Sequence, residues 1–403
     1  MRLIFLTMTN IAGVDTPGIY TDLMRKFRDE GHEVTIVSPR ERRMGLTTCL
    51  EKADGVRILG VRTLNLQKTN VVEKGIGQVL VTRQFKRAIR KKLEGETFDL
   101  ILYSTPPITL AGVVQYLKGN NPRANTYLLL KDIFPQNAVD LGMMVKSGIR
   151  GVLYAHFRRQ EKKLYRYSDH IGCMSPANVR YFLEHNPEIA SGRVEIAPNS
   201  YEMQKKEAMD DSQRDAVRQK YRLPVDRPVF IYGGNLGMPQ GIPFLIRCLD
   251  ANADRDDCHF VVVGNGTEYG KMKSWYEERE PGCVSVFGSL PKVEYDRLVR
   301  ACDVGLIFLD YRFTIPNYPS RLLPYLMERK PVIAATDPNS DTGSIAEQNG
   351  YGFWCPSNDV DAFTACVDRM LASDLDAMGA AGYRFYLENY TVEHTYNAIM
   401  KHF

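Results

Sequence analysis

The 403-residue sequence lacks several features that would assign it to a specialised class of protein. It has no apolar run long enough to span a membrane, and the opening MRLIFLTMTNIAGV is interrupted after a few residues, so we expect a buried first strand rather than a signal peptide. It has no internal repeat at a solenoid period and no low-complexity tract. A hydrophobic content of 44% and a charged content of 25% indicate a soluble globular chain rather than a disordered one.

Cysteine is sparse, and its spacing argues against metal and disulfide frameworks. The eight cysteines lie far apart, with no C-x-x-C pair and no histidine at zinc spacing. The run Asp254-Arg255-Asp256 resembles a D-x-D metal motif only by its letters, because it lies in a polar stretch before a predicted strand. We therefore expect no metal site, and reduced thiols in a cytoplasmic protein.

Charge is distributed unequally along the chain. Residues 1–200 carry a net charge of +11 and the remainder carries −7. Residues 83–92 and 156–166 are basic stretches with helical spacing, which could dock the first half on the inner face of the cell membrane or could be ordinary solvated faces. Nucleic acid is not an expected partner, because these stretches lack interleaved aromatic residues and no recognised binding motif is present.

Short apolar segments alternate with helical patterns through both halves of the chain. The first half has predicted strands at 3–8, 34–37, 100–103, 127–130 and 171–174, and the second at 229–232, 260–263, 284–287, 304–308 and 331–334. This alternation predicts an α/β protein with two consecutive doubly wound parallel sheets. We place the first domain at residues 1–200 and the second at 201–384, with a terminal helix at about 385–403 that packs back on the first.

A glycine-rich loop, GGNLGMPQG at residues 233–241, follows a strand of the second half and precedes a helix, and a second loop, Gly264-Asn265-Gly266, follows the next strand. Glycine lets backbone amides approach a phosphate closely, and a helix N-terminus favours negative charge. The alternative is a tight structural turn. Candidate ligand-binding residues in these loops are Gly234, Asn235, Gln240, Gly241, Gly264 and Gly266.

The segment YRFTIPNYPSRLLPYLMER at residues 311–329 adds a second candidate anion site. A helix is predicted to begin near Pro319-Ser320, with Tyr318 before it and Arg321 in its first turn. The positive charge of an arginine there is unfavourable beside the partial positive charge of the helix N-terminus. A bound anion would neutralise both charges. The alternative is a solvated arginine.

Six segments together resemble the bacterial GT-B glycosyltransferases of family 4, in the order and spacing of that family and over nearly the whole chain. The likeness is greatest to capsule and O-antigen enzymes related to N-acetyl-L-fucosamine transferases, which share a D-x-(W/F)-P segment, here Asp132-Ile133-Phe134-Pro135. The six segments are residues 168–201, GNLGMPQG, VVVGNGTE, VSVFGSLPKVEYDRLVRACDVGLIFL, PSRLLPYLMERKPVIAA and NGYGFWCPSNDVDAF.

The resemblance implies two Rossmann-like domains that face each other across a cleft. It implies a retaining, metal-independent transfer of a hexose or N-acetylhexosamine from a nucleotide sugar, with UDP as the family-level expectation. The nucleotide would bind to the second domain and the acceptor to the first. No cofactor is expected beyond the nucleotide-sugar co-substrate. The acceptor would be a cell-surface polysaccharide or a polyprenyl-diphosphate-linked glycan.

The sequence departs from the family at two places. Many relatives have arginine and lysine where this chain has Asn235 and Gln240, which makes Arg321 the candidate replacement in the phosphate clamp. The glutamates that face ribose and sugar in relatives correspond here to Pro324 and Pro316, whose side chains accept no hydrogen bond. Glu328, one turn further along, is either a partial substitute or an exposed acid.

In the first domain, Asp132 follows an apolar strand on the expected acceptor side. Its carboxylate could orient or deprotonate an acceptor hydroxyl, or it could simply cap the next turn. We also expect Gly13, Thr16 and Gly18, in the loop after the first strand, to lie on the acceptor side. Two rival hypotheses are a UDP-N-acetylglucosamine 2-epimerase and a non-catalytic nucleotide-sugar-binding protein.

Overall fold

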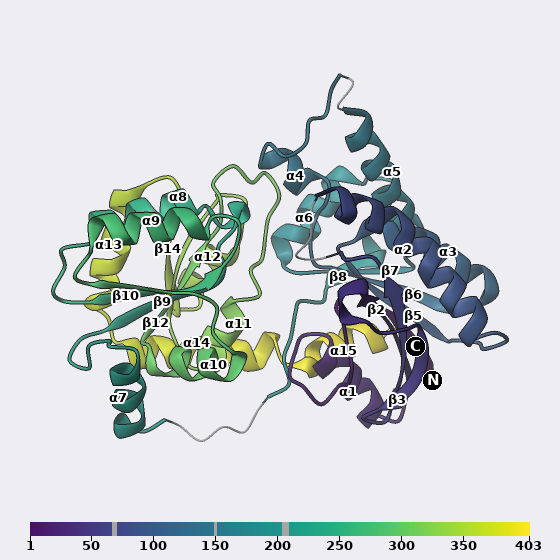
Figure 1. Ribbon diagram of the computed structural model, residues 1–403, viewed down its shortest axis with the longest axis horizontal. Helices are drawn as coiled ribbons and strands as arrows, with labels where there is room; N and C mark the ends of the chain where they lie inside the picture. Colours follow the sequence, from purple (N-terminus) through teal and green to yellow (C-terminus); the bar gives the residue numbers. More distant parts are fainter. Residues whose placement is uncertain (67–70, 149–150, 204–208) are drawn as a thin grey trace. The chain divides into compact units, whose positions relative to one another are not determined.

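The chain forms two units, each built on its own sheet (Figure 1). The computed structural model describes residues 1–66, 71–148, 151–203 and 209–403. Unit 1 comprises Met1–Met203 with Thr391–Phe403, and unit 2 comprises Gln204–Tyr390. The boundary between the units lies three residues beyond the expected one. The segment that rejoins unit 1 begins at Thr391, because the preceding helix, α14 (Leu375–Asn389), packs within unit 2 on α11 (Leu322–Met327).

The elements of unit 1 are β1 (Arg2–Leu6), α1 (Thr21–Asp29), β2 (Glu33–Glu41), η1 (Arg42–Met44), β3 (Cys49–Ala53), β4 (Val56–Thr63), α2 (Val71–Lys92), β5 (Leu100–Thr105), η2 (Ile108–Leu110), α3 (Ala111–Asn120), β6 (Asn125–Leu130), α4 (Gln136–Asp140), α5 (Gly151–Tyr167), β7 (His170–Cys173), α6 (Pro176–His185), η3 (Ser191–Arg193), β8 (Val194–Ile196) and α15 (Val392–Met400).

The elements of unit 2 are α7 (Asp211–Lys220), β9 (Val229–Asn235), η4 (Met238–Gln240), α8 (Ile242–Ala251), β10 (His259–Asn265), α9 (Tyr269–Arg279), β11 (Val284–Phe287), α10 (Lys292–Ala301), β12 (Val304–Phe308), α11 (Leu322–Met327), β13 (Val332–Thr336), α12 (Thr342–Gln348), β14 (Gly352–Pro356), α13 (Val360–Leu371) and α14 (Leu375–Asn389).

Each sheet has a switch point at which the strand order reverses direction. The sheet of unit 1 runs β3-β4-β2-β1-β5-β6-β7-β8, parallel except for β3, and the sheet of unit 2 runs β11-β10-β9-β12-β13-β14, all parallel. The switch points lie between β1 and β5 and between β9 and β12. Ligands of doubly wound sheets bind beyond the carboxyl ends of the strands at such points, so the loops after β1 and β9 are the first places to look for a site.

Helices cover both faces of the sheet of unit 1, because alternate strand residues point to opposite sides. Ile4 and Leu6 belong to a core shared with α2, α3 and α6, whereas Leu3 and Phe5 belong to a second core shared with α1 and α15. The rings of Phe27 and Tyr396, 4.9 Å apart, join α1 to α15. The C-terminal segment is therefore part of the packing of unit 1.

The predicted doubly wound α/β architecture is confirmed, and every predicted strand is present to within a few residues. Four further strands, β3, β4, β8 and β14, were not predicted. Within the described residues, no helix combines the length and the hydropathy that a membrane span requires. The eight cysteines all lie in the described residues, and none is in a disulfide.

Candidate functional site

The two predicted glycine loops meet at the carboxyl edge of the sheet of unit 2. Gly234 of β9 is in register with Gly264 of β10, and the Leu236 amide donates to the Asn265 carbonyl at 2.9 Å. A Cβ at Gly264 would lie 1.9 Å from the Gly234 carbonyl oxygen, and one at Gly266 would lie 2.3 Å from the Leu236 carbonyl oxygen. These two glycines are therefore required by the close packing of one loop on the other.

Gly234 and Asn235 remain exposed at this edge, so the loops do not close over each other completely. The side chains of Asn235 and Gln240 bind each other, Nδ2 to Oε1 at 2.8 Å, and the Gly237 amide also donates to Gln240 Oε1 at 3.3 Å. Both amide side chains thus brace the turn. At positions 235 and 240 this chain therefore has two amide side chains that are hydrogen-bonded to each other.

The end of the glycine turn, at Gly241, packs against the loop after β12, which lies on the other side of the switch point. Its φ of +59° is left-handed, a conformation that glycine adopts readily, and it caps α8. A Cβ at Gly241 would lie 3.3 Å from Asp310 Cα, and the Asp310 amide donates to the Pro239 carbonyl at 3.0 Å. The sequence interpretation did not single out Asp310, an acid placed directly beside the glycine turn.

Arg321 brings a positive charge to the same turn. Its guanidinium carbon lies 4.6 Å from the centroid of the Tyr232 ring, and its Nη2 would lie 3.5 Å from a Cβ at Gly234. Nη1 is buried and has no hydrogen-bond partner. Within the described part of the chain, no carboxylate lies at ion-pair distance from Arg321, and the titratable side chains that interact with it are those of Tyr232, Tyr325 and Tyr295, which are neutral phenols.

Three tyrosines enclose this guanidinium and fix the strand beneath it. The Tyr232 hydroxyl donates to the Asn235 carbonyl at 2.9 Å, and the Tyr325 hydroxyl donates to the Ile231 carbonyl at 3.1 Å. The Tyr295 hydroxyl occupies the space next to Gly233, where a Cβ would approach it to 2.0 Å. Sequence reasoning missed these tyrosines, because each sits in a strand or helix where an aromatic residue reads as ordinary core.

The helix after the proline-rich loop begins later than predicted. α11 spans six residues from Leu322, so Arg321 is its N-cap residue and not part of its first turn. Ser320 is partly buried immediately before Arg321, and its carbonyl accepts from the Leu323 amide at 3.2 Å. The charge available at this end therefore comes mainly from the guanidinium.

Two expectations about this segment require correction. Tyr318, predicted to contact the donor, is only 7% exposed, and its hydroxyl hydrogen-bonds the hydroxyl of Tyr390 in the packing of unit 2. Glu328 is neither an exposed acid nor free to replace a family glutamate, because it forms an ion pair with Arg300 at 3.4 Å. Pro324 lies within α11 and Pro316 is buried, so neither supplies an acceptor.

In unit 1, Asp132 lies at the carboxyl end of β6, as predicted, and Asn137 Nδ2 is 2.9 Å from each of its carboxylate oxygens. Burial raises the pKa of Asp132 to about 6, against the lowering effect of the Ile133 amide and Asn137. A carboxyl group with a pKa of about 6 exchanges protons near neutral pH, as a catalytic base must.

The loop after β1, expected on the acceptor side, is held by two acids outside it, Asp54 between β3 and β4 and Asp22 in α1. Asp54 Oδ2 accepts from the Val14 amide at 2.8 Å and would lie 2.2 Å from a Cβ at Gly13. The Gly18 amide donates to Asp22 Oδ1 at 3.0 Å. Thr16 is exposed, whereas Gly13 and Gly18 are half-buried, so Thr16 is the best placed of the three to contact a ligand.

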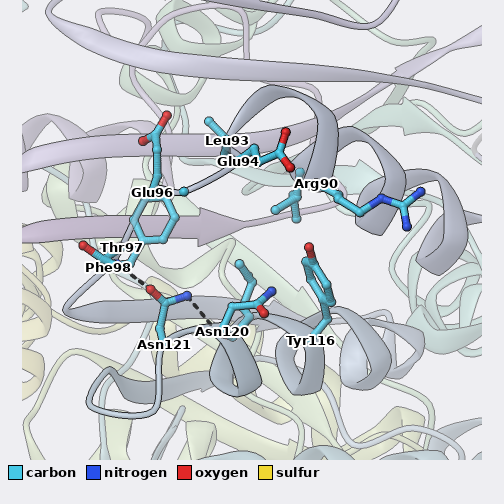
Figure 2. Close-up of a pocket in the computed structure, with 12 residues that line it drawn as sticks. Arg90, Leu93, Glu94, Glu96, Thr97, Phe98, Tyr116, Asn120 and Asn121 are labelled. Carbon is cyan, nitrogen blue, oxygen red and sulfur yellow. Dashed lines mark hydrogen bonds between the residues drawn. The ribbon is translucent and has the colours of Figure 1, made fainter.

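A pocket of about 330 Å³ lies between the C-terminal ends of α2 and α3 (Figure 2). Asn121 closes one side, accepting from the Phe98 amide and donating to the Leu117 carbonyl, both at 2.8 Å. The pocket is at the end of the sheet where β5 begins, and no predicted site residue lines it. It is thus remote from the carboxyl edge where ligands of such sheets bind.

No three metal-ligating side chains come together anywhere in the described ranges. In the Asp254-Arg255-Asp256 run, Asp254 pairs with Arg279 at 2.8 Å and Arg255 pairs with Asp257 and Asp368. These are surface ion pairs.

The chain is similar to proteins described as glycosyltransferases. A family model described as Glycosyl transferases group 1 matches residues 213–385. The chain is 23% identical over 327 residues to a probable glycosyltransferase, WbjE, of Pseudomonas aeruginosa, covering 80% of this chain and 78% of that protein. It is 25% identical over 137 residues to a putative colanic acid biosynthesis glycosyl transferase, WcaI, of Escherichia coli K12, covering 34% and 32%.

Solved structures share the whole fold. Sucrose-phosphate synthase of Thermosynechococcus elongatus superposes with a TM-score of 0.76 at 16% identity, covering 99% of this chain and 97% of that one. Anabaena HepE, solved in complex with UDP, gives a TM-score of 0.67 at 13% identity, covering 100% and 99%. The two Rossmann-like units are therefore a GT-B fold, and the matches favour glycosyl transfer over both rival hypotheses.

Two arginines of unit 2, the buried Arg218 and the half-buried Arg321, provide a test of whether Arg321 is structural. Arg218 donates to three backbone carbonyls and pairs with Asp303, whereas Arg321 has no ionic partner among the described residues. We expect Arg218→Met to lower the free energy of unfolding by about 3–5 kcal/mol, because Asp303 loses its partner. Arg321→Met should change it by less than about 1 kcal/mol, since relief of an unpaired charge offsets the lost ring contact. Urea denaturation compares the two, and equal losses would mean that Arg321 serves stability alone.

Proposed function

We propose that this protein, a glycosyltransferase whose residues 213–385 match the glycosyl transferases group 1 family, uses a UDP-sugar as donor. The observation that carries the proposal is the guanidinium of Arg321, whose Nη1 is buried without a hydrogen-bond partner, which has no counter-ion among the described residues, and which lies against the exposed glycine turn at the switch point of unit 2. A diphosphate would supply the missing negative charge. The UDP complex of the structural neighbour HepE supports UDP as the nucleotide.

The diphosphate would be held by Arg321 together with the backbone amides of the glycine turn. As the bond between the sugar and the β-phosphate breaks, negative charge develops on the leaving group, and donors already oriented at that position stabilise it. This arrangement supports metal-independent transfer. Retention of the anomeric configuration is proposed from the resemblance to family 4.

The acceptor that we propose is a hydroxyl of a cell-surface polysaccharide or of its polyprenyl-diphosphate-linked precursor. The similarity to WcaI, a putative colanic acid biosynthesis glycosyl transferase, supports a role in polysaccharide synthesis. Asp132 would orient this hydroxyl and accept its proton. A hexose or N-acetylhexosamine is the proposed sugar, on the same family resemblance.

Thr16 is the loop residue of unit 1 best placed to help bind the acceptor.

We further propose that the protein works in the cytoplasm, attached peripherally to the inner face of the membrane. Four large apolar side chains between positions 143 and 153 are exposed, including Met143 at 64% and Val152 at 70%. Val152 and Leu153 begin α5, and Arg159 and Arg166 are exposed further along this helix. Each basic residue near an anionic surface contributes about 1 kcal/mol. An apolar segment next to basic residues is the composition that interfacial binding requires.

The donor proposal predicts that Arg321→Met weakens UDP binding by about 10- to 100-fold, because a hydrogen bond to a charged group contributes about 1.5–3 kcal/mol. Isothermal titration calorimetry with UDP measures this. Arg297→Met is the matched control, since Arg297 is on the outer part of α10 with 61% of its side chain exposed. Equal affinities of wild type and Arg321→Met would contradict the proposed clamp.

The acceptor proposal predicts that Asp132→Asn lowers kcat by about 100- to 10,000-fold, the usual contribution of a general base. UDP affinity should stay within twofold, because Asp132 belongs to unit 1. The base acts when ionised and its pKa is about 6, so wild-type activity should fall as pH drops below 6 and level off above 7. UDP release with a detergent-solubilised polyprenyl-diphosphate oligosaccharide reports these rates. A fully active Asp132→Asn variant would exclude this role.

The membrane proposal predicts that wild-type protein sediments with anionic vesicles at low salt. Arg159→Glu with Arg166→Glu should weaken this binding at least about tenfold, because two attractive charges become repulsive. Lys271→Glu with Lys273→Glu on α9 of unit 2 is the control, with side chains 60% and 57% exposed. Binding that is absent, or reduced equally by both pairs, would argue against docking through α5.

A further inference from the structure

The turn after β6 brings one amide side chain directly onto the Asp132 carboxylate. Asn137 is the second residue of α4, and its backbone amide donates to the Ile133 carbonyl at 3.1 Å. This turn directs Asn137 back towards residue 132, where Nδ2 is 2.9 Å from Oδ1 and 2.9 Å from Oδ2. One amide nitrogen thus contacts both oxygens of the carboxylate.

The carbonyl oxygen of the same amide group makes no hydrogen bond in this orientation. Asn137 Oδ1 is buried and has no hydrogen-bond partner. If the amide were rotated by half a turn, its oxygen would face the carboxylate, and Asp132 would lose the one side-chain donor that the described residues offer it. An ionised Asp132 therefore requires the orientation observed. Buried polar atoms without partners are rare and are concentrated where another requirement overrides local satisfaction.

No positively charged side chain of the described residues forms an ion pair with Asp132. The nearby acid Glu161, 2% exposed, accepts from the Tyr165 hydroxyl at 2.6 Å and pairs with Arg158. Lys131, adjacent in sequence, donates its Nζ to the Ala197 carbonyl at 2.9 Å instead. Among the described residues, Asp132 has no ion-pair partner, and Asn137 is its side-chain hydrogen-bond donor.

We propose that Asn137 is a positioning residue that holds the Asp132 carboxylate ionised and fixed in orientation for the proton transfer from the acceptor hydroxyl. The inference rests on the proposed function for the role of Asp132, but the contact itself can be tested without any substrate. A neutral donor suits a base that must gain a proton and lose it in each cycle, because a cation in its place would hold the carboxylate permanently ionised.

The test is a pH titration of the Asp132 Cγ resonance in the whole protein labelled with ¹³C-aspartate, assigned with Asp132→Asn. In Asn137→Leu the midpoint should rise above 6 by about one pH unit or more, since the ionised form loses its side-chain hydrogen bond. Gln136→Leu is the matched control, because Gln136 precedes it on α4 and donates to Asp140 at 2.6 Å. That control should leave the midpoint unchanged.

Asn137→Asp provides a second variant if Asn137→Leu folds poorly. Two carboxyl groups in contact cannot both ionise readily, so its titration should spread into two steps, one well above that of wild type. Titration midpoints that stay at the wild-type value in both variants would overturn the inference. If the midpoints shift while the pH dependence of transfer stays as in wild type, the contact stands, and the role proposed for Asp132 fails instead.

Discussion

A half-buried guanidinium that lies against an aromatic ring, with no carboxylate at ion-pair distance among the residues that the structure describes, is the constraint on which this account of unit 2 depends. Ionised side chains are rarely buried without a partner, because water no longer solvates them and nothing replaces it. Arg321 approaches this situation, because its Nη1 is buried without a hydrogen-bond partner, its guanidinium carbon lies 4.6 Å from the centre of the Tyr232 ring, and a Cβ at Gly234 would lie 3.5 Å from its Nη2. The free protein thus holds in place a charge that an anionic ligand would neutralise.

Sheet topology explains why this charge lies beside the glycine turns. The strand order changes direction at β9, between β10 and β12, so the loops after β9 and β12 lie at the switch point, where ligands of doubly wound sheets bind. Gly241 and Asp310 join those two loops, and Gly264 and Gly266 join the turns after β9 and β10. Unit 1 also has a doubly wound sheet, but the charged candidate residue after its strand β6 is the carboxylate of Asp132, whereas in unit 2 it is the cation of Arg321.

Much of the fold could be predicted because buried parallel strands are continuous apolar runs. The strands that escaped prediction have other patterns: β3 (CLEKA) is a half-exposed edge strand, β8 has three residues, and β14 includes glycine and proline. β4 (VRILGVRT) carries two arginines and a glycine at position 60, which leaves room for Arg40. These strands are specified by their neighbours in the sheet, which a local pattern does not reveal.

The parts of the candidate site that could be predicted are those in which the pairing of strands brings loops together. Contacts that depend on side-chain packing could not be predicted. Parallel pairing of β9 with β10 brings Gly234 to Gly264, as the two glycine loops suggested. The pairing of Asn235 with Gln240, the burial of Tyr318 against Tyr390 and the contact of Asn137 with Asp132 depend on side-chain orientations set by tertiary packing. No spacing along the chain distinguishes these residues from their neighbours.

The most direct measurement of the central claim is a crystal structure of the protein with UDP. The account predicts that the β-phosphate lies within hydrogen-bonding distance of the Arg321 guanidinium and of backbone amides in the turn of residues 233–241. A diphosphate bound elsewhere, with the Arg321 nitrogens still without an anionic partner, would contradict it.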